Sequence, residues 1–245
     1  MADQRPWYDE AFEAGYLELY PHRDGAAARA EVDGLLARGL AGGAGSLLDL
    51  GCGFGRHLQA LVERGVDAWG LDRSPALLAR VAPALRTRVV RGDFRSLPFR
   101  TGVFTAVAML FSSFGYFEDD ENERVLAEVA RVLAPGGLAV LDLMNPARVR
   151  ATLVPESFTA RPGVELRERR YLERAGRRVV KEVEARAADG QARHWREDVR
   201  LYERAELDPL LGRNGLALRR VEGDYDGRSH GPDAPRQIVW AARPG

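Results

Sequence analysis

The sequence is poor in cysteine and has no excess charge of either sign. Cys52 is its only cysteine, so an intrachain disulfide and a cysteine metal cluster are excluded. The 36 Lys and Arg residues balance the 36 Asp and Glu residues, which leaves a formal net charge of zero. A general binder of nucleic acid or of anionic membranes needs a basic excess. The composition therefore disfavours both classes.

Long hydrophobic runs are missing as well. No stretch approaches the roughly 18 apolar residues of a membrane-spanning helix, and residues 1–20 lack the basic start and apolar run of a secretory signal. The 245 residues, 45% of them hydrophobic, suit one large domain or one domain with an insertion. No spacing of His, Asp and Glu resembles a metal site. We expect a soluble, cytoplasmic, metal-independent enzyme.

Hydrophobic periodicity predicts an α/β domain. Residues 5–40 have helical spacing and are followed by Gly-rich residues up to Gly45. Beyond them, apolar runs that predict strands alternate with segments of helical spacing. Strands separated by single helices indicate a parallel sheet with right-handed crossovers. The predicted strands are 46–50, 68–71, 88–91, 103–110 and 138–143, and the clearest helices are 57–64 and 121–133.

The pattern changes after the fifth strand. Residues 159–202 are rich in Arg and Glu with short apolar runs, which predicts inserted antiparallel strands, with a turn at 188–190. A helix at 203–211 and a strand pair at 216–221 and 237–241 follow. We therefore predict three regions. They are an N-terminal helical lid at 1–45, a core at 46–150 and 203–245, and an inserted antiparallel β-rich subdomain at 151–202.

The segment at 47–57 carries the strongest motif. A strand leads directly into Gly51, Gly53 and Gly55, and a helix begins at once. Glycines allow a sharp turn and a close approach to a ligand, and the first helical turn presents unpaired N–H groups. A structural turn can use one glycine, so three at alternate positions after Asp49 favour binding. The dinucleotide fingerprint requires glycine where this sequence has Arg56.

Acidic residues end the next two strands. Asp72 ends the second strand, where a carboxylate can accept both hydroxyls of a ribose; the alternative is a helix-start residue favoured by the helix dipole. Asp93 ends the third strand beside Phe94, and this pair suits an adenine amino group and ring face. Ligands of open α/β sheets bind at such strand ends. The three ends together predict a nucleoside-like ligand.

Four segments resemble, in order, the motifs of class I S-adenosylmethionine-dependent methyltransferases. They are Asp-Leu-Gly-Cys-Gly-Phe-Gly at 49–55, Leu-Asp-Arg-Ser at 71–74, Gly-Asp-Phe-Arg-Ser-Leu-Pro-Phe at 92–99 and Arg-Val-Leu-Ala-Pro-Gly-Gly at 131–137. The resemblance covers about residues 46–143. It implies a doubly wound, mostly parallel, seven-stranded Rossmann-like sheet with an antiparallel last strand. Thr105 departs from the Phe-Asp that usually starts the fourth strand, whereas Phe104 is kept.

The resemblance also implies the cofactor, S-adenosyl-L-methionine, with S-adenosyl-L-homocysteine as product. Asp49 and the glycines would hold the methionine part, Asp72 the ribose, and Asp93 with Phe94 the adenine. The full set of implied cofactor-binding residues is Asp49, Gly51, Cys52, Gly53, Gly55, Asp72, Arg73, Asp93, Phe94 and Met109.

Segments outside these motifs resemble a bacterial group of small-molecule methyltransferases. They lie at 16–24, 110–119, 223–227 and 233–237. The group includes aminosugar N-methyltransferases of natural-product tailoring. The resemblance therefore implies a small-molecule acceptor that is methylated on nitrogen or oxygen.

Methyl transfer from a sulfonium is an in-line displacement, so the protein mainly aligns the reactants and excludes water. A general base is needed only when the nucleophile keeps its proton. The candidate catalytic residues are His22, Ser113 and Tyr116, and the candidate substrate contacts are Tyr20, Arg23, Phe114, Tyr225 and Arg236. Residues 20–23 also fit a polar loop between helices. His57, in the first helical turn, fits packing behind the site.

Two other functions stay open. An RNA or other nucleic-acid methyltransferase would use the Arg-rich insertion as its footprint. The Asn/Asp-Pro-Pro-Tyr and Pro-Cys signatures of DNA-base methylation are missing after the fourth strand, and with the neutral net charge this disfavours a nucleic-acid partner. A protein of this fold could also bind the cofactor without transferring methyl groups. The inserted strands are expected to cover the acceptor pocket or to form a homodimer interface.

Overall fold

The computed structural model describes residues 6–12, 25–40 and 45–245. Its first half contains α1 (Trp7–Ala11), α3 (Gly25–Ala37), β1 (Ser46–Leu50), α4 (Arg56–Glu63), β2 (Ala68–Asp72), α5 (Pro75–Leu78), η1 (Pro83–Arg88), β3 (Val89–Arg91), β4 (Phe104–Met109) and α6 (Asp119–Val132). Its second half contains β5 (Leu133–Met144), α7 (Pro146–Thr152), β6 (Glu156–Arg161), β7 (Val164–Glu173), β8 (Arg178–Ala187), β9 (Ala192–Arg200), α8 (Arg204–Arg213), β10 (Ala217–Glu222) and β11 (Arg236–Ala242).

The described strands form two separate sheets. The larger sheet has seven strands in the order β10-β11-β5-β4-β1-β2-β3. Neighbours from β5 to β3 are parallel, whereas β11 runs antiparallel to both β5 and β10. The smaller sheet has the order β6-β7-β8-β9 and is antiparallel throughout. The predicted fold class, including the antiparallel last strand and the inserted sheet, is confirmed.

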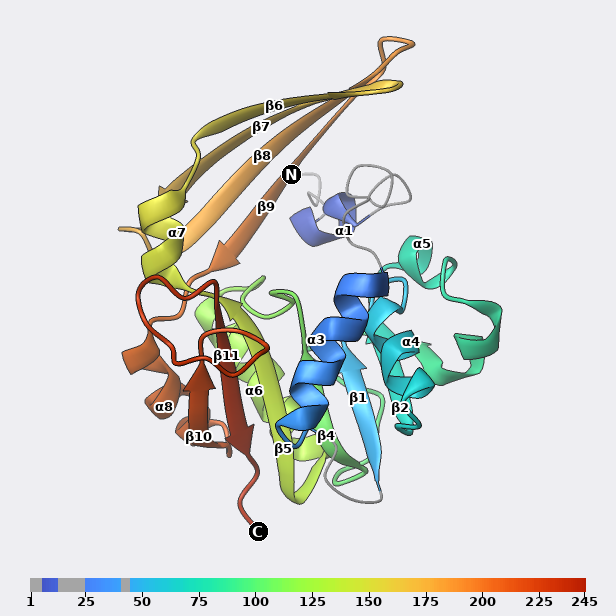
Figure 1. Ribbon diagram of the computed structural model, residues 1–245, viewed down its shortest axis with the longest axis vertical. Helices are drawn as coiled ribbons and strands as arrows, with labels where there is room; N and C mark the ends of the chain where they lie inside the picture. Colours follow the sequence, from blue (N-terminus) through green and yellow to red (C-terminus); the bar gives the residue numbers. More distant parts are fainter. Residues whose placement is uncertain (1–5, 13–24, 41–44) are drawn as a thin grey trace.

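Helices cover both faces of the seven-stranded sheet (Figure 1). Because successive side chains of a strand point to opposite faces, β4 contributes to two cores. Val107 and Met109 pack with the apolar side of α6 and α8. Ala106 and Ala108 pack with the buried residues of α3 and α4. The sheet therefore has no solvated face in this region, as expected for parallel strands.

Local sequence explains several element ends. Serine followed by proline favours a helix start at 74–75, and α5 begins there: the side chain of Ser74 accepts a hydrogen bond from the Leu77 amide at 3.1 Å, and Pro75 is the first helical residue. The Pro-Gly-Gly segment at 135–137 predicts a turn before the strand at 138–143, but in the structure it is an irregularity within β5. Phe104 pairs with Leu133, but Ala106 pairs with Leu138, so the strand absorbs the extra residues.

The four-stranded sheet lies beyond the carboxyl ends of the parallel strands, and α1 lies between the two sheets (Figure 1). Leu166, Val183 and Trp195 of this sheet form a buried cluster with Ala11 of α1 and Leu77 of α5. The predicted turn at 188–190 joins β8 to β9. None of the described helices is long and apolar enough to cross a membrane.

Candidate active site

The glycines of the β1–α4 turn adopt conformations that other residues avoid. Gly51, Gly53 and Gly55 have φ angles of 91°, 55° and 84°. A Cβ on Gly51 would lie 2.8 Å from the Cβ of Ser113, closer than side chains approach one another. The turn therefore needs glycine at position 51 for two reasons, its backbone angle and the loop after β4 that lies against it.

Asp72 connects the ends of β1 and β2. Its Oδ2 accepts a hydrogen bond from the amide of Gly53, and its Oδ1 accepts one from the amide of Ser74, both at 2.8 Å. Burial raises the pKa of Asp72, while the amide donors act in the opposite direction. The two amides hold the carboxylate in one orientation at the floor of the site.

Asp93 and Phe94 follow β3. The Oδ2 of Asp93 accepts from Arg73 at 2.6 Å and from Arg95 at 2.7 Å. The bond with Arg95 is the largest cause of the lowered pKa of Asp93. Phe94 is buried, and its ring meets the ring of Phe117 edge to face, with centroids 6.4 Å apart. The strand end thus combines a carboxylate with aromatic surfaces.

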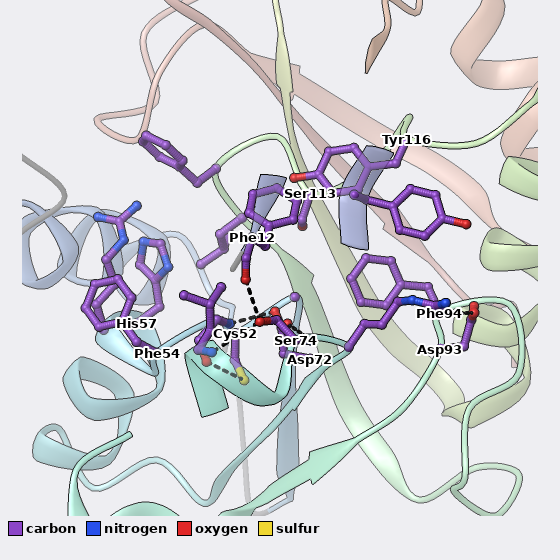
Figure 2. A pocket seen from close by; sticks show the side chains of 18 of the residues that line it. Phe12, Cys52, Phe54, His57, Asp72, Ser74, Asp93, Phe94, Ser113 and Tyr116 are labelled. Carbon is purple, nitrogen blue, oxygen red and sulfur yellow. Dashed lines mark hydrogen bonds and ion pairs between the residues drawn. The ribbon is translucent and has the colours of Figure 1, made fainter. Parts of the chain in front are cut away.

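These strand ends meet in one pocket, with an empty volume of about 890 Å³ that includes its open mouth. Asp93 and Phe94 lie at one end of the pocket, His57 and Phe54 at the other, and Asp72 lies between them (Figure 2). The predicted site residues on its wall are Gly51, Cys52, Gly53, Asp72, Arg73, Asp93, Phe94, Ser113 and Tyr116. The tertiary structure brings together nine residues that the sequence distributes over 51–116.

Three predicted cofactor residues lie off this wall. Asp49 is buried in β1, its Oδ2 has no hydrogen-bond partner in the described part of the chain, and burial raises its pKa to about 6. Met109 points into the core, as the side-chain alternation of β4 requires. Gly55 precedes α4 in a left-handed conformation, and a Cβ there would contact Val81.

Three predicted substrate contacts also lie off the wall. Phe114 is buried and stacks on Tyr202, with centroids 5.3 Å apart. Tyr225 and Arg236 both bind the buried carboxylate of Asp142. The remaining predicted contacts, Tyr20 and Arg23, and the candidate base His22 lie outside the described residues.

Cys52 is a packed residue within the glycine turn. Its side chain is buried, and a Cβ on Gly70 would lie 2.7 Å from its Sγ. Burial, with the nearby carboxylates of Asp49 and Asp72, raises the pKa of the thiol well above its usual value. The thiol is therefore neutral, and it is not an activated nucleophile.

Aromatic residues of the α1 segment, which the sequence motifs did not reveal, also line the pocket. Tyr8 and Phe12 line it, and the Phe12 ring stacks on Tyr116 with centroids 5.8 Å apart. The backbone oxygen of Phe12 accepts a hydrogen bond from the hydroxyl of Ser74 at 2.6 Å. The run of aromatic residues at 7, 8 and 12 was the available signal. It did not show which strand ends they would face.

The sequence motifs also did not reveal a charged cluster at the His57 end of the pocket. The Oε2 of Glu31, in α3, lies 2.6 Å from His57 Nε2 and 3.3 Å from Arg56 Nη1. Burial raises the pKa of Glu31, but the bond with His57 and the charges of His57 and Arg56 outweigh it, so the pKa is lowered. The Arg56 guanidinium lies over the Phe111 ring, 4.6 Å from its centroid. His57 thus joins α3 to α4 at the pocket edge.

The chemistry of this pocket fits a nucleoside that carries an extended chain. The Asp72 carboxylate suits vicinal hydroxyls, and Asp93 with Phe94 suits a purine edge and face. The three glycines of the turn carry no side chain, so the backbone there leaves room for an extended chain. No three His, Cys, Asp or Glu residues are grouped as metal ligands within the described ranges. Fold and site together define a nucleoside-binding enzyme of the doubly wound class.

Comparison with known proteins identifies the family. The family described as "Methyltransferase domain" matches residues 47–137. The dTDP-3-amino-3,4,6-trideoxy-alpha-D-glucopyranose N,N-dimethyltransferase of Streptomyces venezuelae is 31% identical over 193 residues, which cover 76% of this chain and 81% of that protein. The cypemycin N-terminal methyltransferase of a Streptomyces species is 30% identical over 205 residues, covering 81% and 83%.

A solved structure agrees with these relatives. The structure of CalS10 with bound S-adenosylmethionine, an amino pentose methyltransferase of Micromonospora echinaspora, superposes with a TM-score of 0.67 at 26% identity, covering 93% of this chain and 96% of that one. The chain belongs to the class I S-adenosylmethionine-dependent methyltransferases. It is a methyltransferase, and its cofactor is S-adenosyl-L-methionine.

Proposed function

We propose that this methyltransferase acts on an amine nitrogen of a small natural-product precursor, with a nucleotide-linked amino sugar as the first candidate. Two similar proteins carry names of amino sugar methyltransferases, and a third methylates the N-terminus of cypemycin. The names of the first and third proteins specify methylation of nitrogen, and the second protein acts on an amino sugar.

The residues at the strand ends suggest where each part of the cofactor would bind. Asp72 would accept the ribose hydroxyls, and Asp93 with Phe94 would hold the adenine. The amides of the turn at Gly51 and Gly53 would border the methionine part. S-adenosylmethionine supplies a methyl group already activated on a sulfonium, so the chain's own residues need only align the acceptor with it and exclude water.

The observation that carries the amine proposal is the aromatic wall beside Ser113. Phe12 and Tyr116 lie near Ser113 (Figure 2), and Phe54 and Phe111 line the same pocket farther along. An amine becomes an ammonium ion when it accepts a methyl group, and aromatic faces stabilise cations by about 0.5–2 kcal/mol each. The hydroxyls of Ser113 and Tyr116 would orient the amine. A neutral amine has a free lone pair and needs no strong base in the pocket.

A methyl-transfer assay tests this proposal. Isothermal titration with S-adenosylhomocysteine first establishes cofactor binding. The protein with radiolabelled S-adenosylmethionine is then offered a dTDP-linked amino sugar, the corresponding hydroxyl sugar, a short peptide with a free N-terminus and a transfer RNA. Label on the amino sugar or the peptide amine, and not on the hydroxyl sugar, supports amine methylation. Label on the RNA alone contradicts it. Cofactor binding without label on any acceptor favours a protein that does not transfer methyl groups.

We also propose that the inserted sheet helps to cover the acceptor pocket. Its packing on Ala11 of α1 supports this role. A homodimer through this sheet stays a prediction of the sequence, as does a cytoplasmic location. Analytical ultracentrifugation with and without S-adenosylhomocysteine measures the oligomeric state directly.

A further inference from the structure

The pocket wall after β4 contains two residues in an unfavourable backbone conformation. Phe111 and Ser112 have φ angles of 56° and 61°, and neither is glycine. Side chains make this left-handed region costly. Such residues persist only where the surrounding structure determines them, and they cluster at functional sites. Leu110, Phe111 and Ser113 line the pocket, so the strained turn is part of its wall.

Asp142 of β5 binds this turn. Its Oδ2 accepts a hydrogen bond from the amide of Phe111 at 2.7 Å, and its backbone oxygen accepts one from the amide of Ser112 at 3.0 Å. The side chain of Asp142 is fully buried. A buried carboxylate needs a compensating charge and several donors, and two residues far along the chain supply them.

Those two residues are Arg236 and Tyr225. The Nε of Arg236 donates to Asp142 Oδ1 at 2.6 Å, and its Nη2 donates to the hydroxyl of Ser112 at 2.7 Å. The hydroxyl of Tyr225 donates to Asp142 Oδ2 at 2.5 Å. Every side chain of this cluster therefore binds the turn or binds Asp142.

The cluster is also tied to the helix that bears Glu31. A Cβ on Gly34 of α3 would lie 2.3 Å from the backbone oxygen of Tyr225. The helix and the Tyr225 loop are thus in backbone contact, and the position of Tyr225 is set from two sides. The resulting cluster holds together α3, β5 and β11 around the turn.

We propose that Asp142, together with Arg236 and Tyr225, is a positioning group that holds the wall at 111–113 in the shape that the acceptor meets. The inference rests on the proposed function for the identity of the acceptor. None of the three side chains is among the residues that line the pocket. They act through the Phe111–Ser112 turn, which would otherwise relax to a right-handed or extended conformation.

Tyr225→Phe and Asp142→Asn test the proposal, with Tyr171→Phe as matched control. Tyr171 also donates its hydroxyl to a carboxylate, that of Glu182 at 2.7 Å, but in the inserted sheet. Loss of one hydrogen bond to a charged group corresponds to about a tenfold change. We expect kcat/KM for the amino sugar to fall about tenfold in Tyr225→Phe, with the affinity for S-adenosylhomocysteine within about twofold of the wild type. Tyr171→Phe should leave both unchanged.

A rescue separates positioning from general destabilisation. Glycine adopts positive φ without a penalty, so Ser112→Gly should restore part of the activity that Asp142→Asn removes. Ser112→Ala, which keeps the strain and loses the hydroxyl, should restore none. If Asp142→Asn lowers acceptor turnover and cofactor affinity equally, with no rescue by glycine, the role is only structural and the proposal is overturned.

Hydrogen exchange gives a readout that does not need the acceptor. In the S-adenosylhomocysteine complex, we expect the peptide containing 110–114 to exchange faster in Tyr225→Phe than in the wild type. Unchanged exchange there overturns the positioning proposal. If exchange increases while no acceptor amine is methylated by any variant or by the wild type, the positioning role stands and the proposed acceptor class fails.

Discussion

Arg73 binds the carboxylate of Asp9 through two nitrogens. Its Nε lies 2.5 Å from Oδ1 and its Nη2 lies 3.0 Å from Oδ2. The same guanidinium donates to Asp93 through Nη1, so one side chain connects α1 to the end of β3. A helix as short as α1 is not stable by itself. Its place over the pocket depends on this ion pair and on the packing of Trp7 and Ala11.

Asp9→Asn should therefore loosen α1. Partly exposed ion pairs contribute up to about 1 kcal/mol, so the affinity for S-adenosylhomocysteine should fall by about two- to fivefold. Hydrogen exchange of the peptide containing residues 6–12 should accelerate in the complex. Asp33→Asn is the control, because Asp33 forms a similar two-nitrogen pair with Arg64 in the contact of α3 with α4. Equal exchange in the wild type and Asp9→Asn would contradict the role of the pair.

Asp72→Ala should weaken cofactor binding far more than Asp9→Asn does. A carboxylate that accepts two ribose hydroxyls contributes about 1.5–3 kcal/mol per hydrogen bond, so calorimetry should show a loss of at least about tenfold. Asp67→Asn, which changes an exposed carboxylate before β2, should retain wild-type affinity. An affinity for S-adenosylhomocysteine in Asp72→Ala within about twofold of the wild type would remove Asp72 from the cofactor site.

Asp49 should make stability depend on pH. Its folded pKa of about 6 lies above the unfolded value of about 3.9, so the folded protein binds more protons between these values. The free energy of unfolding therefore falls as pH rises from about 4 to about 6. Asp49→Asn should remove this dependence and stabilise the cofactor-free protein above pH 6, by up to about 3 kcal/mol. Urea unfolding at pH 5 and pH 7.5 measures the difference.

Asp67→Asn provides a control of opposite sign. The hydroxyl of Ser46, and after it Arg88, lower the pKa of Asp67. Its contribution to stability is present above the unfolded pKa and is lost as pH falls. Asp67→Asn should therefore destabilise the protein near neutral pH, with the difference vanishing in acid. The same sign for both variants would show that burial does not raise the pKa of Asp49 in the folded protein.

Two glycines of one turn should tolerate alanine differently. In Gly51→Ala, the new Cβ would lie 2.8 Å from Ser113 at a φ of 91°, so Gly51→Ala should lower the melting temperature by several degrees. In Gly53→Ala, the nearest contact would be Leu77 at 3.6 Å and the φ of 55° lies in the left-handed helical region. Gly53→Ala should fold with a smaller loss. Equal melting temperatures would show that the close approach of Ser113 has no energetic consequence.

Local patterns predicted the core of the fold well. The strands at 46–50, 68–71 and 103–110 follow from short continuous apolar runs, and the helix start at Ser74 follows from the capping side chain and the proline after it. The glycine turn and the acids after the second and third strands could likewise be placed in one cleft. The carboxyl ends of parallel strands share one edge of the sheet.

Contacts between distant segments could not be predicted in this way. Tyr225 and Arg236 were expected at the acceptor, but the structure attaches them to Asp142, 83 and 94 residues away. Nothing in the local sequence distinguishes a tyrosine that faces a pocket from one that binds a buried carboxylate. The burial of Asp142 and the packing of Gly34 on the Tyr225 loop decide it.

The sequence by itself determined the family, the succession of the core strands along the chain and the residues that end them. These features follow from motifs of neighbouring residues. Only the tertiary structure decided which distant segments contribute residues to the wall of the pocket. It placed α1 at the pocket through the contact of Asp9 with Arg73, and it bound the Phe111–Ser112 turn to Asp142. Both arrangements depend on long-range ion pairs and burial, and these exist only once the chain has folded.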